Sequence, residues 1–126
     1  MNYIYNMHII ELISEDKIKD IVTDLRNKEK LFVIDCGATW CGPCKTFAKF
    51  YHDYVSNYPQ TNEVVFCKLD IDDVSDFCEV NNITSVPTIL FIKNSEVVER
   101  MVGADINKFK SILSRWLQKS HSAIQK

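Results

Sequence analysis

The stretch Trp40-Cys41-Gly42-Pro43-Cys44-Lys45 decides how the rest of this chain is interpreted. It follows an apolar run and precedes a segment of helical periodicity, so its two cysteines fall at the N-terminus of a predicted helix. That spacing brings both sulfurs within bonding distance, and the free N–H groups and dipole of the helix N-terminus favour a thiolate. The stretch therefore predicts thiol–disulfide exchange, in which Cys41 attacks and Cys44, about one turn further on, resolves the mixed disulfide.

Length and composition favour a single compact domain over residues 1–126. The chain has 126 residues and is 46% hydrophobic, which suffices for a core without disulfide cross-links. Its 15 Lys and Arg stand against 17 Asp and Glu, for a net charge of -2, and no basic block occurs. We therefore expect no binding to nucleic acid or to an anionic membrane. We also expect the protein to be a monomer.

The cysteine count and the first residues indicate a reducing compartment. Met1 to His8 contains no Lys or Arg and no apolar run of the length of a signal sequence, so we expect a cytoplasmic protein. Five cysteines, an odd number, argue against a framework of structural disulfides and leave redox chemistry or metal binding. A zinc site is disfavoured because no second CxxC occurs and Cys67, Cys78 and His52 do not have paired ligand spacing.

Hydrophobic periodicity predicts alternating strands and helices. Parallel strand–helix–strand units followed by a hairpin give an α/β fold, with a mixed sheet of about five strands and about four helices on both faces. We expect a core over about residues 8–118, a short N-terminal extension, and a frayed polar tail after about Lys119. The predicted strands are 7–10, 31–36, 64–69, 88–92 and 96–102; the predicted helices are 15–27 with Ser14 as N-cap, 43–57, 74–80, and one after Asp105 as N-cap.

Two residues have both an ordinary and a functional interpretation. Asp35 interrupts an apolar run, so it is either a buried carboxyl that exchanges a proton with Cys44 or a solvated residue at a strand end. Pro87 either opens an ordinary strand or follows a cis peptide bond. Unaided, the sequence favours the ordinary proline, since only about 5% of X–Pro bonds in folded proteins are cis.

The sequence resembles the thioredoxin family over about residues 8–118. The resemblance rests on Val33-Ile34-Asp35, on Trp40 to Lys45, and on Ser85-Val86-Pro87-Thr88 about 40 residues later. It implies the thioredoxin fold and a protein-disulfide reductase with a redox-active Cys41–Cys44 disulfide and no bound cofactor. It also implies a proton-accepting Asp35 with Lys68 as its charge partner, and a cis Pro87 against the disulfide.

Partners and a substrate surface also follow from the resemblance. Gly42 and Pro43 between the cysteines imply a reducing poise, and the usual electron donor is an NADPH-dependent thioredoxin reductase. The targets would be disulfide-containing proteins, bound on an apolar patch around Cys41 that comprises Trp40, Gly42, Pro43, Val86, Gly103 and Ala104.

Two alternatives and several departures from the family pattern remain. The alternatives are a disulfide oxidase or isomerase of the same fold, and a redox-silent binding module. Cys36 stands where the family often has an aromatic or a small polar residue, and Gly37 replaces a bulky one, which makes Cys36 a candidate regulatory thiol. Lys49 replaces a frequent helix proline, and Ser95 replaces the usual hairpin glycine.

Overall fold

The computed structural model describes residues 7–125, with side chains up to Leu117, and contains one five-stranded sheet. The predicted extension therefore lies mostly outside the described residues. The elements in chain order are β1 (Ile9–Glu11), α1 (Glu15–Thr23), the 3-10 helix η2 (Leu25–Asn27), β2 (Leu31–Gly37), α2 (Gly42–Ser56), β3 (Val64–Asp70), α3 (Ser75–Val80), β4 (Thr88–Lys93), β5 (Glu96–Val102) and α4 (Ile106–Gln125).

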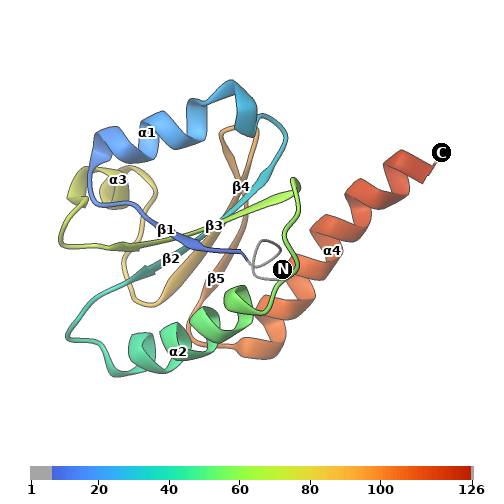
Figure 1. Ribbon diagram of the computed structural model, residues 1–126. Helices are drawn as coiled ribbons and strands as arrows, with labels where there is room; N and C mark the ends of the chain where they lie inside the picture. The colour runs from blue at the N-terminus through green and yellow to red at the C-terminus, as the bar shows by residue number, and fades with distance from the viewer. Residues whose placement is uncertain (1–6, 126) are drawn as a thin grey trace.

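The sheet has the order β1-β3-β2-β4-β5 and is mixed (Figure 1). Strands β1, β3 and β2 are parallel, whereas β4 runs antiparallel to β2 and pairs with β5 as a hairpin. Helices α1 and α3 cover one face, and α2 and α4 cover the other. This arrangement confirms the predicted fold class, and it explains why the central strand β2 is buried on both faces.

An aromatic cluster holds α2 against the sheet. Phe109 of α4 lies edge-on to Phe47 and Tyr51 of α2, with ring centroids 5.5 and 5.9 Å apart. The Tyr51 hydroxyl is buried and donates to the Cys67 carbonyl of β3 at 2.8 Å. These contacts fix the position of α2 relative to β2 and β3, and with it the position of the CxxC stretch.

Helix starts were predicted better than helix ends. Ser14 and Asp105 accept backbone N–H bonds as N-caps, from Lys17 and Lys108 respectively. The first helix was predicted to run to Asn27, but α1 stops at Thr23, because Asp24 has an extended backbone and its carboxylate accepts from the Arg26 N–H to begin η2.

The last helix was also misjudged. It continues to Gln125, past the boundary predicted near Lys119. No glycine or proline follows Asp105 to stop it, and a helix that is already nucleated extends at little cost.

The hairpin turn keeps its geometry without the usual glycine. Asn94 and Ser95 connect β4 and β5, and both have positive φ values, 52° and 65°. Two successive positive φ angles match the twist of a two-residue hairpin, which explains how Ser95 serves in this position.

Candidate active site

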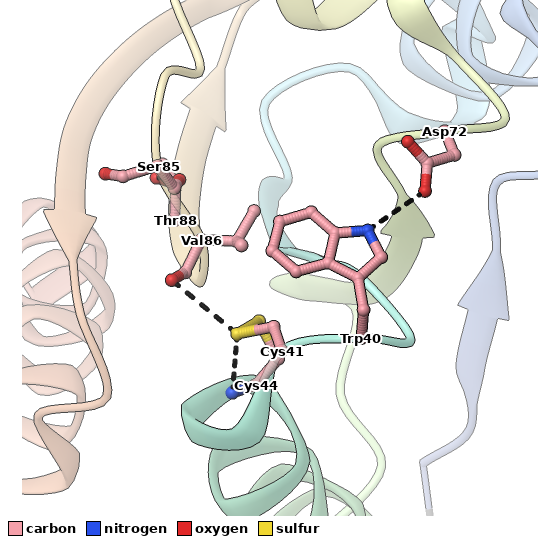
Figure 2. The surroundings of a disulfide bond; sticks show 7 residues. All are labelled: Trp40, Cys41, Cys44, Asp72, Ser85, Val86 and Thr88. Atoms are coloured by element: carbon pink, nitrogen blue, oxygen red, sulfur yellow. Dashed lines mark hydrogen bonds between the residues drawn. A yellow bond between two sulfur atoms is a disulfide. The ribbon is translucent and has the colours of Figure 1, made fainter.

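The CxxC stretch forms the beginning of α2. Cys41 is the N-cap residue, and its sulfur accepts the Cys44 backbone N–H at 3.1 Å (Figure 2). Pro43 lies in the first turn, where its missing N–H leaves no hydrogen bond unmade. Cys41 and Cys44 are joined by a disulfide, with their Cα atoms 5.2 Å apart. The predicted pairing is therefore present.

The two cysteines are equally buried in this oxidised form. Each is 6% exposed, so the oxidised form does not make Cys41 the more accessible sulfur. The disulfide packs with Ala38 and against the half-buried side chains of Ile71 and Val86.

The proline segment lies directly against the disulfide. The Val86–Pro87 peptide bond is cis, as the family resemblance implied and the ordinary interpretation did not. The Val86 carbonyl oxygen lies 3.7 Å from the Cys41 sulfur. On the other side, the Gly103 N–H donates to the Pro87 carbonyl at 2.8 Å, and Gly103 has a φ of 97°. The fold thus brings Val86, Pro87 and Gly103 together beside Cys41, with Ala104 exposed next to Gly103.

Trp40 is an exposed aromatic residue at the rim of the site. Its side chain is 67% exposed, and its indole N–H donates to an Asp72 carboxylate oxygen at 3.3 Å (Figure 2). The sequence contained Asp72 in the acidic run after β3 but did not indicate this contact, because the two residues are 32 positions apart. The hydrogen bond orients the indole at the edge of the disulfide.

Asp35 is a buried carboxyl below the active site. It is 6% exposed, and burial raises its pKa from 3.8 to about 7, against the opposing effect of the Lys68 charge. The solvated alternative for Asp35 is therefore wrong. Asp35 and Cys44 line the same pocket of about 180 Å³ between β2, β3 and α2. One carboxylate oxygen, Oδ1, has no hydrogen-bond partner among the described residues.

Lys68 acts on Asp35 through its charge and not through a direct contact. The two residues are register partners on β2 and β3, and Lys68 is exposed. Among residues 7–117 no ion pair joins them. The attraction is therefore too weak to offset the burial of the carboxyl, in agreement with the raised pKa.

Gly37 leaves space beside the second cysteine. It follows Asp35 on the same face of β2, and a Cβ built at Gly37 would lie 3.4 Å from the Cys44 Cβ and 3.5 Å from the Cys44 sulfur. A larger residue would occupy part of the pocket that Asp35 and Cys44 share. The departure at this position thus widens the space behind the disulfide.

The three remaining cysteines belong to the core. Cys36, Cys67 and Cys78 are free thiols that pack between the sheet and helices α1 and α3. Burial raises the pKa of the Cys36 thiol well above its usual range, that of Cys67 to about 12, and that of Cys78 to a smaller extent. Cys36 is fully buried and points to the face opposite Asp35, so the structure contradicts its interpretation as a regulatory thiol.

Two further observations concern metals and membranes. Within the described part of the chain, no group of three or more His, Cys, Asp or Glu residues could hold a metal ion. None of the described helices is both long and apolar enough to cross a membrane.

A cysteine pair at a helix N-terminus, beside a cis proline and above a buried carboxyl, defines a thiol–disulfide oxidoreductase. Comparisons with known proteins agree. The thioredoxin family model matches residues 11–118. A thioredoxin from Ophiophagus hannah is 39% identical over 88 residues, covering 70% of this chain and 81% of the relative. Thioredoxin 1 from Plasmodium falciparum is 37% identical over 90 residues, covering 71% of this chain and 84% of the relative.

Solved structures give the same result. Thioredoxin from Nicotiana alata superposes with a TM-score of 0.78 at 29% identity, covering 87% of this chain and 93% of that one. Thioredoxin from Plasmodium falciparum superposes with a TM-score of 0.74 at 34% identity, covering 85% and 98%. The chain belongs to the thioredoxin family, and its activity is dithiol–disulfide exchange that reduces protein disulfides.

Proposed function

We propose that Cys41 is the attacking thiol and Cys44 the resolving thiol of this reductase. The observation that carries the assignment is the position of Cys41 as N-cap, where its sulfur receives the Cys44 N–H at 3.1 Å and lies at the positive end of α2. Both interactions favour a thiolate on Cys41.

The exchange proceeds in two balanced steps. The Cys41 thiolate attacks one sulfur of a target disulfide, the target S–S bond breaks, and the leaving sulfur takes a proton. Cys44, once deprotonated, then attacks the Cys41 sulfur, closes the Cys41–Cys44 disulfide and releases the second target thiolate, which is protonated in turn. Two electrons and two protons pass to the target, and the structure represents the oxidised product.

Asp35 is proposed to accept the Cys44 proton in the resolving step. A pKa of about 7 suits a group that must gain and lose a proton at neutral pH, and the shared pocket connects Asp35 with Cys44. Lys68 would limit the rise of the Asp35 pKa through its positive charge.

The target is proposed to bind on the surface around Cys41. This surface comprises Trp40, Val86, Gly103 and Ala104, with Gly42, Pro43 and Pro87 supporting it. The contact of the Val86 carbonyl with the Cys41 sulfur and the hydrogen bond from the Gly103 N–H to the Pro87 carbonyl support the assignment. An extended target segment would pair with the Val86 backbone.

The proposed cycle takes its electrons from an NADPH-linked thioredoxin reductase and needs no cofactor bound to this chain. We place the protein as a monomer in the cytoplasm, where a reducing poise keeps such a dithiol reduced. Sedimentation and cell fractionation test these two assignments.

The decisive experiment is insulin reduction with dithiothreitol as electron donor. Wild type should accelerate precipitation of the insulin chains, and Cys41→Ser should abolish the acceleration. Pre-reduced Cys44→Ser, mixed with insulin after the dithiothreitol has been removed, should accumulate a mixed disulfide that mass spectrometry detects. Cys78→Ala, which removes a core thiol on α3, should match wild type. No acceleration by wild type would instead indicate a redox-silent binding module. A reduction potential of the Cys41/Cys44 pair of about -120 mV, rather than about -270 mV, would indicate an oxidase.

A further inference from the structure

Thr88 is a buried polar residue next to the proline segment. It is 1% exposed and opens β4, where it pairs with Cys36 of β2 and Val102 of β5. Its backbone is therefore held from both sides in the interior of the sheet. Its hydroxyl donates to the Ser85 carbonyl oxygen at 2.7 Å, so the buried donor is satisfied.

This hydrogen bond closes the short loop that carries Val86 and Pro87. The Thr88 hydroxyl on Ser85 and the Gly103 N–H on Pro87 both tether the stretch 85–87 to the neighbouring chain. Residues 81–87 lie outside any helix or strand, and Ser85 itself is exposed. The tether from Thr88 therefore links the exposed loop to the rigid sheet.

The loop is the part of the site that must be placed accurately. The Val86 carbonyl lies 3.7 Å from the Cys41 sulfur, and Figure 2 shows Ser85, Val86 and Thr88 together beside the disulfide. A shift of the loop by about 1 Å would misalign a target segment paired with Val86 and slow the attack of Cys41. It would leave the Cys41 sulfur and the N-terminus of α2 in place.

We propose that Thr88 is a positioning residue for protein targets, whose hydroxyl holds the Ser85–Pro87 loop in its target-binding conformation. The inference rests on the proposed role of Val86 in binding targets. Its consequence is selective: protein disulfides, which pair with the loop, depend on the Thr88 hydroxyl, whereas small disulfides, which need only the Cys41 sulfur, do not.

The experiment compares two disulfides and three variants. Thr88→Val has the same shape without the hydroxyl, Thr88→Ala is a second variant without it, and Thr88→Ser retains it. Each pre-reduced protein is reacted with insulin and with the small aromatic disulfide of thionitrobenzoate. Loss of one buried hydrogen bond predicts a roughly tenfold lower second-order rate constant for insulin in Thr88→Val and Thr88→Ala. With the small disulfide the rate constant should stay within about twofold. Thr88→Ser should restore the insulin rate.

Each outcome supports or overturns a defined claim. Equal losses for both disulfides, or a Thr88→Ser variant as slow with insulin as Thr88→Val, would show that Thr88 has only a structural role. Reduction of neither disulfide by wild type would refute the proposed function, and this inference with it. Circular dichroism melting identifies any variant that does not fold, and the remaining hydroxyl-free variant then decides.

Discussion

At the scale of single residues, Asp35 couples the stability of the protein to pH. Its pKa is 3.8 when unperturbed and about 7 in the fold, so the folded state binds the proton more tightly than the unfolded state. The stability that the protonated Asp35 contributes is therefore fully present below about pH 4 and is lost as pH rises toward 7. At about 1.4 kcal/mol per pH unit, the loss is up to about 4 kcal/mol.

We predict that Asp35→Asn removes this pH dependence. The free energy of unfolding of the variant should exceed that of wild type above pH 7, because no charge is then buried, and should approach it near pH 4. Urea denaturation of the oxidised proteins across this pH range provides the measurement. Parallel curves for the two proteins would contradict the raised pKa of Asp35.

The same substitution should slow disulfide reduction at neutral pH. Asn cannot accept the Cys44 proton, so we expect the rate of disulfide reduction to fall at least about tenfold. A tenfold fall is smaller than the usual contribution of a general base. Stopped-flow oxidation of the pre-reduced proteins by insulin measures this rate. Identical rates for wild type and Asp35→Asn from pH 6 to 8 would exclude the role of Asp35 as proton acceptor.

Two glycines of the site should respond in opposite directions to the same substitution. Gly37→Ala places its methyl group in ordinary contact with Cys44, so restricting the unfolded chain should stabilise the protein by about 0.5–1 kcal/mol. Gly103 has a φ of 97°, so Gly103→Ala should destabilise it by about 1–2 kcal/mol although nothing lies within 4 Å of the new methyl group. Urea denaturation measures the stability change of each variant. If both substitutions stabilised the protein, or both destabilised it, backbone conformation would not decide the outcome.

At the scale of secondary structure elements, α3 depends on a side chain from α1. The α3 N-cap residue, Val74, makes no side-chain cap hydrogen bond. Instead both carboxylate oxygens of Glu15 accept backbone N–H bonds, from Asp76 and Phe77, each at 3.1 Å. The two helices on this face of the sheet are thus joined through one carboxylate.

We predict that Glu15→Ala destabilises the protein by about 1–2 kcal/mol, as for the loss of an N-cap. The matched control is Asp16→Ala, which removes an exposed carboxylate from the same turn of α1 and should change stability by less than about 0.5 kcal/mol. Thermal and urea unfolding compare the two variants. Equal losses of stability in Glu15→Ala and Asp16→Ala would show that these carboxylates act on the dipole of α1, and that the hydrogen bonds of Glu15 to α3 add nothing.

At the scale of the whole molecule, the two cores should hold the fold without the disulfide. One core lies between the sheet and helices α2 and α4, and the other lies under α1 and α3. The disulfide closes a loop between residues only three positions apart, so it restricts the unfolded chain little.

Reduction of the Cys41–Cys44 disulfide should therefore leave the fold intact. The chain-entropy relation gives a loss of about 2 kcal/mol for so short a loop. Far-ultraviolet circular dichroism and urea denaturation, with and without dithiothreitol, measure the change. Loss of secondary structure on reduction would refute the view that the cores hold the molecule together.

The sequence by itself determined the features that depend on neighbouring residues. The spacing of Cys41 and Cys44, the proline in the first turn, the caps at Ser14 and Asp105 and the periodicity of strands and helices are all local, so local patterns predicted them. The same reasoning failed at Asp24 and at the end of α4, where helix ends depend on small free-energy differences.

Only the tertiary structure decided the features that join distant segments. The burial of Asp35 depends on the helices and strands packed around it, and the Val86–Pro87 bond is cis in the fold although the residues alone favoured an ordinary proline. The Trp40–Asp72 bond spans 32 positions, and Glu15 reaches α3 across 61. Burial and long-range hydrogen bonds are properties of the assembled chain, because the residues that create them become neighbours only when the sheet and its helices pack.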